Sequence, residues 1–297
     1  MGASRSAMGP HAARQSTGAM TDTERDMTVV VTGASGRVGR RLAHAARAAG
    51  AAVRPASRAS GFDWQDRSTW ADALRGADAA FLAHPSDVGA PDAAEAVGAL
   101  AREAAGLGVR RLALLSARGE EQARPTEEAL RDAGADWTVV RSAWFAQNFS
   151  EGPLVAELRE RGELVFPAGE VQEPFVDARD VADVVVAALT SGDRYAGQVL
   201  EVSGPRLLTF GEAVAEIAKE TGRALTYRAV SPAEYGANLA AFGVPDEEAA
   251  FLVGLFASLL DGRNAHLSDG VRQVLGRPPR DFGGYVRDAA TAGAWDA

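Results

Sequence analysis

The stretch Val29-Val30-Val31-Thr32-Gly33-Ala34-Ser35-Gly36-Arg37-Val38-Gly39-Arg40-Arg41-Leu42 decides the fold of this chain. A β-branched apolar strand runs into three glycines at three-residue spacing, and a helix rich in alanine and arginine follows. Gly33 permits the sharp turn, Gly36 lets backbone approach a phosphate, and Gly39 lets the helix pack closely on the strand. The helix N-terminus then presents free N–H groups to an anion. The stretch therefore predicts a dinucleotide site; the alternative is a glycine-rich turn in an α/β protein without a ligand.

An excess of arginine follows these glycines. Neither Asp nor Glu occurs from Met27 to Phe62, although the whole chain has a formal net charge of −9 at pH 7. NAD sites place an acidic residue about 20 residues beyond the glycines, whereas NADP sites place an arginine there. We therefore predict NADP(H) as cofactor, with Arg58 and Arg37 holding the 2′-phosphate through their guanidinium forks. Three further arginines, on the helix, are expected to be solvated: Arg40, Arg41 and Arg47.

The composition excludes several functional classes. The chain lacks cysteine, which excludes disulfides and thiolate chemistry, and its four histidines lack metal-ligand spacing, so no metal is expected. The 31 basic residues are outnumbered by 40 acidic ones, which argues against a nucleic-acid partner. Without an apolar stretch that could span a bilayer, we expect a cytoplasmic protein with no membrane partner and a small-molecule substrate. The sequence does not indicate the oligomeric state.

Strands alternating with helices predict an α/β fold, a Rossmann-type doubly wound parallel sheet with a smaller, mostly helical C-terminal substrate lobe. We expect residues 1–26 to be a disordered leader and residues 27–150, completed by 175–202, to form the core. Residues 151–174 and 203–297 would then form the lobe. Expected elements include a short strand at 62–64, one helix over 145–161, a helix capped by Asp177, and strand 198–202 returning to the sheet.

Ligands bind at the carboxyl ends of the strands in such a sheet. The residues predicted to line one cleft there are Gly33, Arg58, His84, Ser116 and Ser142.

The tyrosine–lysine pair of ordinary short-chain dehydrogenases cannot exist in this chain. Its only lysine is Lys219, and the residue four positions before it is Ala215. A reductase without that pair needs another proton donor, or a substrate that needs none. A cyclic iminium becomes a neutral amine on accepting hydride, and a quinone gives an oxyanion that is already stable near neutral pH. Both substrates suit a site that chiefly positions nicotinamide and excludes water.

Several segments together resemble the NmrA-like atypical short-chain dehydrogenases. They lie between residues 28 and 202 and comprise Thr32–Gly39, Phe62–Trp64, Leu112–Ser116, Val139–Phe149 and Phe175–Ala182. The Phe62-Asp63-Trp64 run and the Trp-Phe-x-x-Asn pattern at 144–148 resemble in particular the festuclavine dehydrogenase-like, NAD(P)H-binding group. That resemblance implies reduction of a cyclic iminium with NADPH in secondary metabolism. The wider family includes quinone reductases, isoflavone-type reductases and sensors that bind a dinucleotide without turnover.

The resemblance also implies roles for individual residues. Arg58 would hold the 2′-phosphate, Asp63 and Trp64 would lie near adenine, and Ser116 and Ala143 would lie near nicotinamide. The residues implied to hold the pyrophosphate are Gly33, Ser35, Gly36, Arg37, Val38 and Gly39. Those implied along the adenosine ribose and the diphosphate are Ala83, His84 and Pro85. The isoflavone-type mechanism uses a lysine as proton donor and does not carry over to this chain.

Candidates for substrate contact follow the strand ends. We expect Ser116 and Trp144 to position substrate, with Ser116 alternatively bonding backbone, and His84 to contact ribose rather than act as an acid. Aromatic walls and a polar neighbour are expected from Trp144, Phe145, Asn148 and Phe149, against a purely structural role. Four acids are expected to be solvated at a helix start, with orientation of substrate or attraction of a cation by one of them as the alternative: Glu120, Glu121, Glu127 and Glu128. Arg141 is expected to pair with Asp180.

Three functions remain open from the sequence. The first is an NAD(P)-dependent oxidoreductase, specifically an NADPH-dependent reductase of a cyclic imine or iminium, a quinone or a similar conjugated molecule. The second is a dinucleotide-binding redox sensor without turnover, and the third is a non-redox cyclase or dehydratase on the same scaffold. An aromatic pocket beside nicotinamide would favour the reductase, whereas a pocket closed by side chains would favour the sensor.

Overall fold

Strand β1 lies inside a six-stranded sheet with the order β2-β1-β3-β4-β5-β8, and all neighbouring strands in it are parallel. The computed structural model describes residues 1–2 and 26–296. The leader expected over 1–26 therefore falls almost wholly outside the described residues. The strands are β1 (Thr28–Thr32), β2 (Ala52–Ala56), β3 (Ala79–Leu82), β4 (Arg111–Ala117), β5 (Asp136–Ser142) and β8 (Gln198–Val202). Strand β8 pairs with β5, which confirms that residues 198–202 return to the sheet.

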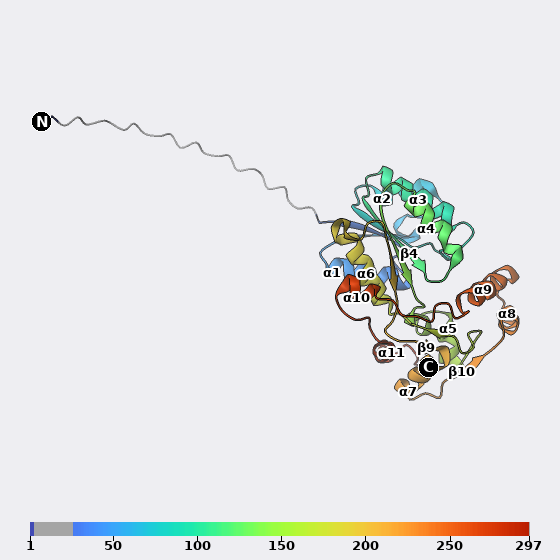
Figure 1. Cartoon of the computed structure of the whole chain (residues 1–297). Coiled ribbons are helices and arrows are strands. Elements are labelled where there is room, and N and C mark those ends of the chain that lie inside the picture. The colour runs from blue at the N-terminus through green and yellow to red at the C-terminus, as the bar shows by residue number, and fades with distance from the viewer. Residues whose placement is uncertain (3–25, 297) are drawn as a thin grey trace.

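Helices cover both faces of this sheet, as Figure 1 shows. Because side chains alternate along a strand, Val31 of β1 packs on one face while Val30 packs on the other. The first face carries α1 (Arg37–Ala48), α6 (Ala178–Thr190) and α10 (Gly270–Leu275), and the second carries α2 (Trp70–Leu74), α3 (Ala93–Gly106) and α4 (Arg124–Arg131). This arrangement confirms the predicted doubly wound Rossmann-type fold.

A second body of structure lies beyond one end of the sheet (Figure 1). It contains two small sheets, in which β6 (Glu163–Phe166) is parallel to β10 (Thr226–Ala229) and β7 (Gln172–Glu173) is antiparallel to β9 (Leu208–Thr209). Its helices are α5 (Pro153–Glu160), α7 (Phe210–Thr221), α8 (Pro232–Ala241), α9 (Asp246–Leu259) and α11 (Phe282–Thr291). A separate aromatic core stabilises it. We keep the domain limits predicted from the sequence as a proposal.

Helix α6 begins where the sequence predicts. Asp177 is its N-cap, because its carboxylate accepts a hydrogen bond from the Arg179 amide at 2.8 Å. Gln147 fixes the preceding chain to this point, since its side chain donates to Asp177 at 2.9 Å and accepts from the Ala178 amide at 2.8 Å. These bonds tie the segment after β5 to the start of α6.

Two predicted elements are wrong. Residues 62–64 form a loop with only an isolated bridge between Asp63 and Asp66, because the Asp63 carbonyl accepts a hydrogen bond from the Trp70 indole at 2.7 Å. Residues 145–161 are not one helix, because Gly152 is extended and proline at 153 lacks the N–H that a helix interior needs. A 3₁₀ turn therefore precedes α5.

The 3₁₀ turns are η1 (Arg58–Ser60), η2 (Arg67–Thr69), η3 (Glu121–Ala123), η4 (Ala146–Phe149) and η5 (Gly192–Tyr195).

The predicted pair between Arg141 and Asp180 is also wrong. Arg141 lies one residue after Val140, which packs on the α6 face, so its side chain points to the opposite face, where α4 lies. There its guanidinium donates to Glu127 at 2.6 Å and 2.8 Å. Asp180, fully buried on α6, pairs with Arg280 and with Arg277 at 2.7 Å.

These contacts predict that Asp180→Ala lowers the free energy of unfolding by about 2–3 kcal/mol, because it removes the buried carboxylate that binds both arginines. Asp183→Ala is the matched control, since Asp183 contacts the same arginines but its side chain is 30% exposed. Asp183→Ala should lower the free energy of unfolding by only about 0–1 kcal/mol. Urea unfolding followed by circular dichroism measures both changes, and equal losses in the two variants would contradict this account.

Candidate functional site

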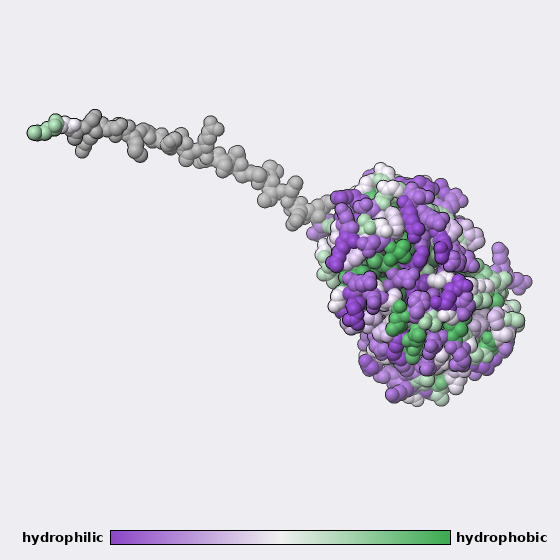
Figure 2. Space-filling model, viewed as in Figure 1, coloured by the Kyte–Doolittle hydropathy of each residue, from purple (hydrophilic) through white to green (hydrophobic). Residues whose placement is uncertain are grey.

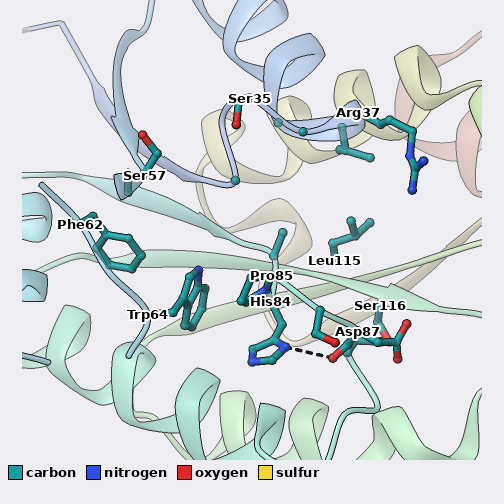
Figure 3. Close-up of a pocket in the computed structure, with 18 of the residues that line it drawn as sticks. Ser35, Arg37, Ser57, Phe62, Trp64, His84, Pro85, Asp87, Leu115 and Ser116 are labelled. Carbon is teal, nitrogen blue, oxygen red and sulfur yellow. Dashed lines mark hydrogen bonds between the residues drawn. The ribbon is translucent and has the colours of Figure 1, made fainter. Parts of the chain in front are cut away.

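A cavity of about 750 Å³ lies at the carboxyl ends of the parallel strands. All five strand-end residues predicted to share one cleft line it: Gly33, Arg58, His84, Ser116 and Ser142. Other predicted cofactor residues that line it are Ser35, Gly36, Arg37, Val38, Gly39, Asp63, Trp64, Ala83 and Pro85. We call this space the first cavity; Figure 3 shows many of these residues around it.

The glycine turn shapes one wall of the first cavity. Gly33 has a φ of +61°, which favours glycine, and its carbonyl accepts a hydrogen bond from the Gly36 amide at 2.8 Å. A Cβ on Gly39 would overlap the Gly33 carbonyl oxygen and lie 2.7 Å from the carbonyl carbon. Helix α1 then begins after Gly36 without a side-chain cap and without an acidic residue in its first turn. Its first amides are therefore free for an anion in the cavity.

The structure separates the two arginines expected to share the 2′-phosphate. Arg58 follows β2 on η1, next to Ser57, and both line the first cavity. The Arg37 guanidinium instead donates to the Glu151 carbonyl at 3.3 Å and packs against Gly152. Figure 3 shows Arg37 across the cavity from Ser57. Arg58 and Ser57 thus lie together in the cavity, whereas Arg37 lies elsewhere on the wall, and the 2′-phosphate role of Arg58 stays a prediction.

An aromatic and imidazole cluster lines the end of the first cavity near Arg58. Trp64 meets the rings of Phe62 and His84 edge-on, with ring centroids 5.7 Å and 5.6 Å away. The His84 side chain is 3% exposed, and its Nδ1 lies 3.1 Å from the Asp87 carbonyl oxygen (Figure 3). This arrangement is suited to a planar base and a ribose, so the roles predicted for Trp64 and His84 stay predictions that the geometry allows.

Ser116 is the terminal member of a buried chain of polar groups. Its hydroxyl donates to Glu127 at 2.7 Å, and Glu127 in turn is bound by Arg141. Burial alone would raise the pKa of Glu127, but the hydrogen bonds from Arg141 and Ser116 lower it. The expectation that Glu127 is solvated is therefore wrong. Because its proton is engaged, the Ser116 hydroxyl can accept a hydrogen bond from a ligand but has no free proton to donate.

A second cavity of about 470 Å³ adjoins the first. The lining residues that the two cavities share are Arg37, Asp87, Ala117, Ser142 and Phe145. Its apolar walls come from the end of β5 and from α8 and α9, and they include Trp144, Phe166, Tyr235, Leu252 and Phe256. Of the residues predicted near substrate or nicotinamide, Ala143, Trp144, Phe145 and Asn148 line this second cavity.

Phe149 lies outside both linings. It is fully buried between Phe175 and Phe210, with ring centroids 5.2 Å and 5.7 Å away. The reason is the 3₁₀ turn η4, which directs Asn148 to the cavity and Phe149 into the aromatic core. We therefore remove Phe149 from the proposed substrate wall.

The second cavity also holds the charged residues Arg118, Glu120 and Glu173, of which only Glu120 was considered from the sequence. Arg118 and Glu120 follow β4, and Glu173 comes from β7. Glu120 is 5% exposed, so the expectation that it is solvated is wrong. Burial raises the pKa of Glu173 to about 7 although the positive charge of Arg118 lowers it. No motif marks these positions, because their burial depends on the lobe that closes over them.

In the described part of the chain, no group of three or more His, Asp or Glu side chains is placed to hold a metal ion. The helices within residues 1–2 and 26–296 include none long and apolar enough to cross a bilayer.

Comparison with known proteins identifies relatives over nearly the whole chain. The family models that match are the RmlD substrate binding domain over residues 27–122 and the NmrA-like family over residues 122–267. An uncharacterized oxidoreductase, YesF, of Bacillus subtilis is 30% identical over 90% of this chain and 96% of its own. The (4-alkanoyl-5-oxo-2,5-dihydrofuran-3-yl)methyl phosphate reductase of Streptomyces griseus is 34% identical over 89% and 98%. Festuclavine synthases and agroclavine dehydrogenases of fungi are 26–28% identical.

Solved structures share the fold. The NADPH complex of the quinone oxidoreductase QOR2 from Escherichia coli has a TM-score of 0.72 at 22% identity, covering 88% of this chain and 99% of that one. At this identity the likeness concerns the fold alone.

Because Gly39 lies so close to the Gly33 carbonyl, we expect Gly39→Ala to displace that carbonyl and to distort the turn. Affinity for NADPH should fall at least about tenfold, equivalent to about 1.4 kcal/mol. Gly106→Ala is the control, because Gly106 ends α3 with nothing within 4 Å of an added Cβ. Titration calorimetry with NADPH measures both, and wild-type affinity in Gly39→Ala would contradict the proposed turn geometry.

Proposed function

The chain belongs to the NmrA-like family of atypical short-chain dehydrogenases/reductases, and from this premise we propose that it is an NADPH-dependent reductase. It would transfer a hydride to a small conjugated substrate, a quinone or a cyclic imine or iminium. The observation that carries the proposal is the junction of the two cavities: Ser142 and Phe145 line both. A dinucleotide in the first cavity would place its reactive end at this junction, next to an aromatic space large enough for a substrate.

The first cavity suits NADPH. The uncapped N-terminus of α1 and the Gly33 turn would hold the pyrophosphate, and Arg58 with Ser57 would hold the 2′-phosphate. When bound, NADPH supplies the hydride. The chain's own residues orient it and exclude water, and the Phe145 ring separates the two spaces.

The second cavity suits an aromatic or conjugated substrate. The Trp144 ring meets Phe166 and Phe256 with centroids 5.9 Å and 5.7 Å away, forming a rigid wall. No lysine lines either cavity in the described part of the chain. Tyr235 reaches the second cavity, but burial raises its pKa to about 12, so it stays protonated and is not prepared as a tyrosinate.

The open second cavity supports the reductase over the sensor. A sensor without turnover needs no space for a second small molecule, whereas the proposed reductase does. The names of the relatives, among them a dihydrofuran-phosphate reductase, support reduction of small conjugated molecules.

The direct test of this function is NADPH oxidation, followed at the cofactor absorbance, with a panel of acceptors. The panel contains menadione, 2-cyclohexenone and N-methyl-3,4-dihydroisoquinolinium. We expect turnover with at least one of them and tight NADPH binding without any. Tight binding with no turnover for the whole panel would instead favour the sensor.

Cofactor choice gives a second prediction. Arg58→Ala should weaken NADPH binding about 10- to 100-fold, because charge-assisted hydrogen bonds contribute roughly 1.5–3 kcal/mol. NADH binding should stay within about twofold. Arg47→Ala, on the far end of α1 and outside the cavity lining, is the control. If the wild type binds NADPH and NADH equally well, and Arg58→Ala changes neither affinity, then the assignment of NADPH as cofactor and of Arg58 to its 2′-phosphate would be overturned.

A further inference from the structure

Buried polar atoms without hydrogen-bond partners gather in the second cavity. Nine such side-chain atoms occur in the described part of the chain, and seven belong to residues that line this cavity. Buried polar groups in folded proteins are almost always hydrogen-bonded, so a cluster of unpartnered atoms in a cavity marks groups available to a bound molecule. The residues concerned are Arg118, Glu120, Trp144, Asn148 and Glu173.

Glu120 lines the second cavity and lies beside a residue that lines both cavities. That residue is Asp87, and the Glu120 carboxyl also packs against the backbone of Gly89. Neither carboxyl oxygen has a donor within strict hydrogen-bond geometry in the described residues. Burial and the adjacent Asp87 carboxyl, with which Glu120 can share a proton, raise the pKa of Glu120 to about 8, so this pair of carboxyls retains a proton at neutral pH.

We propose that Glu120 is the proton donor of the reaction, in place of the tyrosine–lysine pair that this chain lacks, and that the substrate is a conjugated carbonyl compound rather than an iminium cation. The inference rests on the proposed reductase function and narrows its substrate. An iminium needs no proton after it accepts a hydride, so a protonated carboxyl in the cavity has a use only with a carbonyl-type acceptor.

The step balances as a conjugate reduction. A hydride, with its electron pair, adds to the β-carbon of the substrate, and the π electrons shift toward the carbonyl oxygen to give an enolate. The Glu120 carboxyl then transfers its proton to the enolate, which completes the saturated carbonyl product. The Glu120 carboxylate regains a proton from water, so each turnover consumes one NADPH and one proton.

Arg118 supplies a site for the carbonyl oxygen. Arg118 is 3% exposed, and its Nε and Nη1 atoms lack hydrogen-bond partners. A carboxylate oxygen of Glu201 lies 3.6 Å from Nε. Asn264 holds this loop by donating to the Arg118 carbonyl at 3.1 Å. A fixed guanidinium with free donors stabilises an enolate oxygen and repels a cation.

The other charged groups leave the wall without a net positive charge, so the preference for an oxygen acceptor rests on the unpartnered donors of Arg118. Burial raises the pKa of Glu173 to about 7, and Arg37 contributes a positive charge from α1. The remaining charged residues of the lining are Asp87, beside Glu120, and Glu248, from α9. With Glu120 protonated, the donors that converge on the cavity are Arg118, Trp144 and Glu120, which together favour an oxygen acceptor.

The test compares Glu120→Gln with wild type on 2-cyclohexenone, and on menadione, whose reduced form is stable as an oxyanion. We expect kcat for 2-cyclohexenone to fall about 100-fold, the usual scale for loss of a general acid, with KM and NADPH affinity changed less than about threefold and with a smaller loss on menadione. Wild-type kcat should decline above about pH 8, as Glu120 loses its proton, and Glu120→Gln should lose this decline. Glu120→Asp, which keeps a carboxyl, should recover part of the rate.

Glu121→Gln is the matched control, because Glu121 is the next residue, has the same side chain and pairs with Arg124 in solvent. It should keep wild-type rates and the wild-type pH profile. Unchanged kcat for 2-cyclohexenone in Glu120→Gln, or faster turnover of the dihydroisoquinolinium than of either carbonyl acceptor, would overturn this inference while leaving the reductase function in place. Absence of turnover with every acceptor in the wild type would overturn both.

Discussion

The contact between the Gly39 backbone and the Gly33 carbonyl is the constraint on which the rest of the structure depends. There is no room for a Cβ between them, so α1 packs directly on the turn that leaves β1. This contact aims the N-terminus of α1 into the first cavity, and the parallel sheet brings the ends of its strands to the same edge. The second body of structure closes over that edge and creates the aromatic cavity next to it.

Much of the fold and of the first cavity could be predicted from local patterns. The glycine spacing, the strand–helix alternation and the Asp177 cap are encoded in short stretches of sequence, so the sheet and its five strand-end residues were predictable. The predictions of two elements were wrong, and in both cases the cause is a nearby residue in the sequence. The extended Gly152 with the proline after it interrupts the helix predicted over 145–161, and the Trp70 indole binds the Asp63 carbonyl that a strand would have used.

The second cavity could not be predicted in the same way, because its chemistry depends on tertiary burial. Glu120 and Glu121 are adjacent in sequence, yet the first is enclosed beside Gly89 while the second is solvated. Glu127 and Arg141 were expected to serve other roles, and only the alternation of side chains along β5 places Arg141 toward α4. Such differences follow from which face an element buries, which no single motif records.

Arg37 lines both cavities. Its guanidinium donates a hydrogen bond to the carbonyl of Glu151, just before α5. In a reductase with a ligand in each cavity, one side chain would then contact both ligands. A ligand in either space would then alter the surroundings of that group for the other ligand. Thermodynamic linkage makes any such effect mutual: whatever the dinucleotide contributes to substrate affinity, the substrate contributes equally to dinucleotide affinity. A side chain shared by the two cavities would in this way couple the two binding events.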